Sequence, residues 1–197
     1  MTLPELTITP AEPILDEVLT PNGAAAYLQT TRRNITKLLE AGYLKDLSLS
    51  SLAPIRKADL VSAGGKLPLI QTAPAEEGTD DWRKWWGDAP TLSDKDWLNA
   101  QRGDWTGAGA DRIEKVGYLL IGLGGVISGV TKVIKAVPSR DPRRARFELE
   151  LLGRLTGELK SYEKTFPETS TEEEQIFAFT LIGQRYETRQ GGSVMWL

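Results

Sequence analysis

The sequence predicts an α+β protein in which a small helical unit precedes a mostly β, barrel-like domain. Two short segments near the N-terminus carry apolar residues at helical spacing and begin with good helix caps. Farther along the chain, runs rich in β-branched and aliphatic residues alternate with glycine and proline turns. All six tryptophans lie beyond residue 80, so the composition changes between the two parts.

The composition argues against an enzyme. The chain of 197 residues has no cysteine and no histidine, which removes thiolate catalysis, cysteine-bound zinc and the commonest general acid–base group. We therefore expect no catalytic residue, no metal site and no cofactor. The net charge is −3, so any contact with nucleic acid must come from a local basic patch.

The chain ends and the apolar runs indicate a cytoplasmic protein without a membrane partner. Residues 1–13 lack the basic start and apolar centre of a signal peptide. The uncharged run Val116–Thr131 is shorter than the roughly 18 to 20 residues that a spanning helix needs, so we expect buried strand there. Residues 1–19 carry prolines and four acidic residues, which predicts an extended acidic arm.

The first organised block covers residues 20–66. Thr20 can cap a helix whose first position is Pro21, and Thr30 or Thr31 can cap a second helix. The expected elements are a helix from Pro21 to about Leu28, a turn at Gln29-Thr30, a helix from about Arg32 to Ala41, a hairpin over Tyr43–Leu52 and a short helix near Lys57–Ser62.

Two helices joined by a tight turn and followed by a hairpin match the plan of a winged helix-turn-helix. The stretch "LTPNGAAAYLQTTRRNITKLLEAGYL" and the closing "IRKADL" resemble the excisionase and MerR-type winged-helix family, over about a quarter of the chain. The resemblance implies a DNA-binding domain whose second helix enters the major groove. The family's wing is usually basic, whereas this one reads "LSLSSLAP", so we expect few contacts from it.

A linker over residues 67–80 is expected next, because prolines, glycine and acidic pairs give it a boundary composition. Residues 81–197 then predict the mostly β domain. Its expected elements are a helix over Asp94–Arg102 and strands over Tyr118–Ile121, Val126–Val137, Arg146–Leu152, Ile176–Ile182 and Val194–Trp196.

The β domain resembles the PUA-like superfamily, which includes ASCH and EVE modules. The segments compared are "SDKDWLNAQRGDW", "YLLIGLGGVISGVTKV", "RFELELLGRL" and "QGGSVMW", and the likeness rests on their order and spacing. It implies a β-barrel with a pocket for nucleic acid or a modified base.

The candidate DNA-contacting residues lie in the helical unit. Residues 21–66 hold seven positive and three negative side chains, a local charge of +4 in a chain of net charge −3. The N-terminal end of a recognition helix faces the major groove, where arginine reads guanine and asparagine reads adenine. A solvated polar helix face is the plainer alternative. The candidates are Thr31, Arg32, Arg33, Asn34, Lys37, Arg56 and Lys57.

Two further groups could contact nucleic acid in the β domain. Aromatic side chains stack on unpaired bases, which suggests a base pocket at Trp105, Trp85 and Trp86, although tryptophans more often fill a core. The loop "PSRDPRRARF" offers phosphate contacts at Arg140, Arg143 and Arg144. The alternative there is a solubilising loop in which Asp141 pairs with the arginines.

The sequence therefore favours a sequence-specific DNA-binding protein, either a transcriptional regulator or a recombination accessory factor of a phage or mobile element. Its expected partners are double-stranded DNA and a second copy of the chain. One alternative is a reader of modified or flipped bases in a restriction or anti-phage system. Another is an antitoxin-like protein whose C-terminal domain binds a protein partner.

Overall fold

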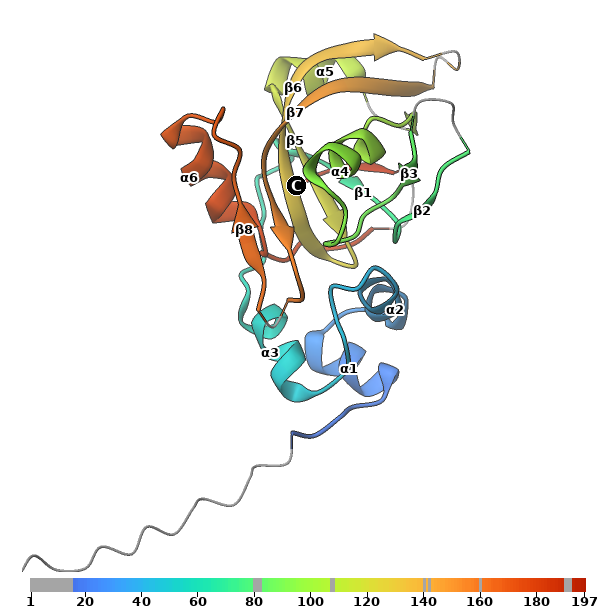
Figure 1. The fold of residues 1–197 in the computed structure, drawn as a ribbon, viewed down its shortest axis with the longest axis vertical. Helices are drawn as coiled ribbons and strands as arrows, with labels where there is room; N and C mark the ends of the chain where they lie inside the picture. Colours follow the sequence, from blue (N-terminus) through green and yellow to red (C-terminus); the bar gives the residue numbers. More distant parts are fainter. Residues whose placement is uncertain are drawn as a thin grey trace, which may run out of the picture.

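The computed structural model describes residues 16–79, 83–106, 109–139, 141, 143–159, 161–189 and 193–197. It shows an α+β protein in which three helices gather beneath a curved sheet (Figure 1). The sequence predicts this combination of a helical unit and a β domain. None of the helices in this described part is long and apolar enough to cross a bilayer. The helices are α1 (Pro21–Leu28), α2 (Arg32–Glu40), α3 (Leu49–Lys57), α4 (Asp94–Gln101), α5 (Ala110–Val116) and α6 (Glu172–Leu181).

The main sheet is barrel-like. Its strand order is β4-β7-β6-β5-β1-β9, with β8 also paired to β7. The pair β1–β5 is parallel and the other pairs are antiparallel. The Thr106 hydroxyl of β4 lies 3.4 Å from the Ser193 hydroxyl beside β9, so the two ends of the sheet nearly meet. The strands are β1 (Pro68–Gln71), β2 (Glu76–Glu77), β3 (Trp85–Trp86), β4 (Trp105–Thr106), β5 (Tyr118–Leu123), β6 (Val126–Pro138), β7 (Arg144–Thr156), β8 (Glu163–Thr165) and β9 (Val194–Trp196).

The first two helices confirm the prediction. The Thr20 hydroxyl accepts a hydrogen bond from the Gly23 N–H, and Pro21 occupies the first turn, where its missing N–H costs nothing. Gln29 ends α1 in the left-handed conformation, with φ 53°. The Thr31 hydroxyl caps α2 by accepting from the Asn34 N–H. Local capping chemistry therefore sets both helix starts.

The predicted hairpin over Tyr43–Leu52 is wrong. The serine-rich segment starts a helix instead, because the Ser48 hydroxyl accepts from the Ser51 N–H and caps α3. The closing helix expected near residues 57–62 is displaced as well, since α3 already ends at Lys57. The β structure described within residues 43–52 is limited to an isolated bridge between Ser48 and Val18.

The strand predicted over Ile176–Ile182 is also wrong, because residues 176–181 belong to α6 and Ile182 follows its last residue. Thr171 and Glu174 form a reciprocal capping box, in which each side chain accepts from the other's backbone N–H. Three glutamates in the first turn further favour a helix start. The helix packs on β6 and β7 at the outer side of the sheet (Figure 1).

The segment expected as a linker contains part of the sheet. Strand β1 pairs with β5 on one side and β9 on the other, and its Leu69 and Ile70 are fully buried. Residues 76–77 form β2, which pairs with β3 in a small separate ribbon. The run "LPLI" carries enough apolar surface to be buried, despite the prolines that suggested a boundary.

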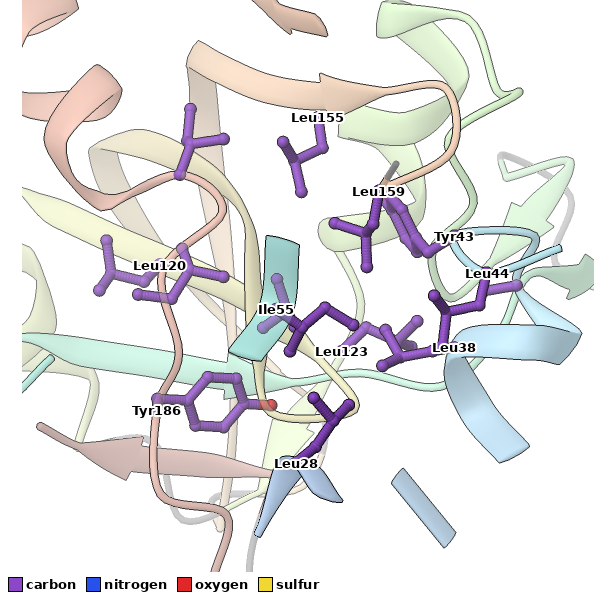
Figure 2. Close-up of a cluster of buried hydrophobic side chains, with 14 of the residues drawn as sticks. Leu28, Leu38, Tyr43, Leu44, Ile55, Leu120, Leu123, Leu155, Leu159 and Tyr186 are labelled. Atoms are coloured by element: carbon purple, nitrogen blue, oxygen red, sulfur yellow. The ribbon is translucent and has the colours of Figure 1, made fainter. Parts of the chain in front are cut away.

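One hydrophobic core joins the helices to the sheet. Leu28, Leu38 and Ile55 of α1, α2 and α3 face side chains of the sheet and of the segment that follows α6 (Figure 2). At Gly124, between β5 and β6, a Cβ would lie 2.7 Å from the Leu38 Cγ and 2.8 Å from the Asn34 carbonyl oxygen. The glycine therefore lets α2 sit directly on the β5–β6 turn, which fixes the helix relative to the barrel.

Candidate nucleic-acid interface

A pocket of about 330 Å³ lies between α2 and the edge of the sheet where β4 and the residue before β9 nearly meet. Its wall comes from α2, the segment that follows β1, the β2–β3 ribbon and the connection from α4 to β4. The side chains that give the wall its chemistry are Lys37, Glu76, Arg83, Trp86, Asp104 and Trp105. Two aromatic rings, two cations and two carboxylates thus meet around one cavity.

The structure brings two of the three predicted pocket tryptophans together. Trp86 and Trp105 are half-buried and line the pocket. The Trp105 indole N–H donates to the Gln101 carbonyl at 2.8 Å, which fixes its ring at the wall. Trp85 does not line this pocket, because neighbouring residues of a strand point to opposite faces. Its ring lies 5.6 Å from the Lys84 amine instead.

Lys37 connects α2 to the pocket. Its Nζ donates to the Thr72 carbonyl at 3.0 Å, just beyond the end of β1. Partial burial, together with the positive charge of Arg33, lowers the pKa of the Lys37 amine. The helix expected to contact DNA therefore contributes a side chain to the cavity that the tryptophans line.

Asn34 does not lie on the exposed face of α2. It is only 7% exposed, and its Nδ2 donates to the Thr30 hydroxyl at 2.8 Å and the Thr188 hydroxyl at 3.1 Å. These bonds tie α2 to the segment after α6, so the amide is not presented to a base edge. Thr31, Arg32 and Arg33 remain exposed at the N-terminal end of the helix.

The other predicted contacts in the helical unit are exposed at the end of α3. Arg56 places its guanidinium 5.9 Å from the centre of the Tyr27 ring, and Lys57 is the last residue of the helix. Neither lines the tryptophan pocket. They add positive charge to the helical unit without contributing to the cavity.

The arginine loop between β6 and β7 is partly neutralised by its own acid. Arg143 contacts the Asp141 carboxylate through Nε at 3.2 Å and through a terminal nitrogen at 3.1 Å. Arg144 approaches the same carboxylate at 3.7 Å. The hydrogen bonds from Arg143 lower the pKa of Asp141. Arg140 lies outside the described residues.

A buried acid that the sequence did not single out supports the pocket wall. The Asp88 carboxylate is fully buried and accepts hydrogen bonds from the Tyr43 hydroxyl at 2.8 Å, the Trp97 indole N–H at 2.7 Å and the Ser128 hydroxyl. Burial raises the pKa of Asp88, and these three hydrogen bonds oppose the increase. The donors come from the segment after α2, from α4 and from β6, so Asp88 joins the helical unit to the barrel.

Gly87, next to Asp88, forms part of the wall itself. Its φ is +84°, and a Cβ there would lie 2.4 Å from the Pro74 carbonyl oxygen, so a larger residue does not fit. Gln101 donates from Nε2 to the Gly87 carbonyl at 2.8 Å, while its buried Oε1 has no hydrogen-bond partner. Close backbone packing and the hydrogen bond from Gln101 therefore hold Gly87 in place in the pocket wall.

A larger cavity of about 480 Å³ lies between the α1–α2 turn and residues 185–188. It is lined by threonines, leucines, glycines and Arg185, and its one aromatic residue, Tyr186, is only 4% exposed. Burial raises the pKa of that tyrosine. Without an accessible aromatic face, this cavity offers less for stacking a base than the pocket at Trp86 and Trp105.

The described residues contain no cluster of three or more acidic side chains placed to hold a metal ion. No family model matches the chain, and neither the curated proteins nor the solved structures that were compared with it gave a match.

Proposed function

We propose that this protein binds nucleic acid and holds an unpaired base in the pocket lined by Trp86 and Trp105. One observation carries the proposal: Lys37 of α2 and both tryptophans line the same cavity of about 330 Å³. One cavity thus combines a lysine from the basic helix α2 with two aromatic rings on which a base could stack.

The chemistry of the wall suits a nucleotide. Stacking a base on an aromatic side chain contributes about 1–3 kcal/mol. Lys37 and Arg83 supply positive charge for a phosphate, and Asp104 and Glu76 supply acceptors for the amino groups of a base. Removing a base from a duplex costs a few kcal/mol, and least where the base is mismatched or damaged. The pocket should therefore prefer nucleic acid that already contains an unpaired base.

The two family resemblances belong to this proposal. The α1–α2 pair with its short turn is compatible with a helix-turn-helix unit, and the nearly closed sheet is compatible with a PUA-like barrel. In this arrangement the helical unit contacts the backbone, and the barrel receives the base. A modified base in a restriction or anti-phage system would use the same pocket.

A binding titration tests the proposal. The full chain is titrated by fluorescence anisotropy against two labelled duplexes that differ only in one unpaired base. We expect tighter binding to the duplex with the unpaired base, and a loss of roughly tenfold for Trp105→Leu or Trp86→Leu, equivalent to about 1.4 kcal/mol of stacking. Trp85→Leu is the matched control, because Trp85 is also half-buried in β3 but does not line the pocket.

Equal affinity for both duplexes, unchanged by either pocket substitution, would show that the pocket does not hold a base. A Trp85→Leu loss as large as that of Trp105→Leu would instead show that the tryptophans act only through folding. Circular dichroism of each variant establishes that the fold is retained.

A sequence-specific regulator that reads intact duplex is the second candidate, and the exposure of Arg32 and Arg33 on α2 favours it. The same titration distinguishes it. Affinity that depends on the duplex sequence, disappears in Arg33→Ala and ignores the unpaired base would support the regulator.

A further inference from the structure

We propose that Lys37 captures an aldehyde inside the pocket, namely the ring-opened sugar of an abasic nucleotide, by forming a Schiff base at its Nζ. This inference rests on the proposed function, because an abasic nucleotide would reach the pocket at the same place as an unpaired base. It adds a covalent step to a site that otherwise only binds.

The position of the amine supports the step. The Nζ of Lys37 is fixed by its hydrogen bond to the Thr72 carbonyl at 3.0 Å, in the cavity that Trp86 and Trp105 line. No other lysine of the described chain lines this pocket. An abasic nucleotide has no base to occupy the cavity of about 330 Å³, so its sugar could approach the wall where the amine lies.

The surroundings of Lys37 also favour a nucleophilic amine. Only the neutral amine attacks a carbonyl, and lysines become nucleophilic when they are desolvated or lie beside another cation. Both conditions hold here, since burial and Arg33 lower the pKa of Lys37. Glu76 and Asp104 are the acidic side chains that line the same pocket, and the Asp104 carboxylate pairs with Arg146 at 2.9 Å.

The reaction needs no further reactant. The Nζ lone pair attacks C1′ of the aldehyde, and the π electrons of the carbonyl move to its oxygen. Two protons pass from the nitrogen to that oxygen, which leaves as water while the C=N bond forms. One amine and one aldehyde thus give one imine and one water, with no change of oxidation state.

Trapping with borohydride tests the inference, because hydride reduces the imine to a stable secondary amine. The probe is an oligonucleotide with one abasic site, made by enzymatic removal of uracil, and mixed with the full chain at matched fractional binding. We expect a cross-linked band on a denaturing gel, and peptide mapping by mass spectrometry should place the adduct on Lys37. Lys37→Arg should lower the yield at least about tenfold, since arginine stays protonated.

Lys164→Arg is the matched control. The Lys164 Nζ also donates to a backbone carbonyl, that of Phe179 at 2.7 Å, and burial lowers its pKa, but it lies outside the pocket. This variant should cross-link like the original chain. An adduct that maps to another lysine, or that Lys37→Arg retains, would overturn the inference.

The same experiment separates this inference from the proposed function. Binding to the unpaired duplex without any trapped adduct on the abasic probe would refute covalent capture and leave the base pocket in place. Failure to bind either probe would refute both.

Discussion

Asp88 shows how one side chain connects the two parts of the molecule. Its carboxylate is fully buried, and it accepts hydrogen bonds from a tyrosine, a tryptophan and a serine that belong to three separate segments. Removing such an acceptor leaves buried donors without partners, and each of them then costs about 1–3 kcal/mol. The stability of the junction behind the pocket therefore depends strongly on this residue.

We expect Asp88→Ala to lower the free energy of unfolding by at least about 3 kcal/mol, because three buried donors lose their acceptor. Urea denaturation followed by tryptophan fluorescence measures the change. Asp59→Ala is the control, since that side chain is exposed. Similar stability for both variants would show that the Asp88 hydrogen bonds contribute little.

Residue-scale prediction from the sequence succeeds where the chemistry is local. The caps at Thr20 and Thr31 could be predicted because each bonds a backbone group three residues away. Asp88 could not, since its partners lie up to 45 residues away along the chain. For the same reason the sequence suggests a base contact for Asn34, although the structure ties its amide to the Thr188 hydroxyl in the interior.

At the scale of one element, α6 depends on Glu174. This side chain accepts from the Thr171 backbone N–H at 3.0 Å and pairs with the Lys132 amine at 2.7 Å, so it both caps α6 and holds it on β6. The hydrogen bond from Lys132 is the main cause of the lowered pKa of Glu174. A carboxyl whose pKa falls on folding stabilises the fold while it is ionised, and this contribution disappears as the pH falls through the lowered pKa.

Glu174→Gln should therefore reduce the unfolding free energy by up to about 1 kcal/mol near neutral pH, because the amide can still cap the helix but loses the charge that pairs with Lys132. The difference from the original chain should shrink at acid pH, as the pH falls through the lowered pKa and the carboxyl is protonated in the folded state as well. Glu173→Gln serves as the control, because Glu173 is exposed on the same turn. A deficit for Glu174→Gln that is the same at neutral and at acid pH would contradict the role of the ionised form.

The hairpin predicted over Tyr43–Leu52 and the strand predicted over Ile176–Ile182 are wrong for the same physical reason. The residues of α3 and α6 are apolar enough to suggest strands, but each helix begins at a cap, Ser48 in one case and the Thr171–Glu174 box in the other. Of these two helix-start signals, the Thr171-x-x-Glu174 spacing is a known sequence signature of a capping box. In both segments the start signal decides the structure, and short apolar runs are ambiguous without it.

At the scale of the whole molecule, the pocket is a product of tertiary structure. Lys37 belongs to α2, Trp86 to the β2–β3 ribbon and Trp105 to β4, and the packing of α2 on the β5–β6 turn brings them together. The sequence indicated a basic helix and a set of tryptophans separately. Their convergence could not be predicted, because it depends on how α2 is seated on the barrel.

Photo-cross-linking of the unpaired base tests the central proposal most directly. A duplex carries 5-iodouracil either as the unpaired base or as a paired base, and the cross-linked peptide is identified by mass spectrometry. The proposed function predicts an adduct on Trp86 or Trp105 with the unpaired base and little adduct with the paired one. Adducts that map instead to α2 or α3 with both duplexes, and never to the two pocket tryptophans, would contradict it.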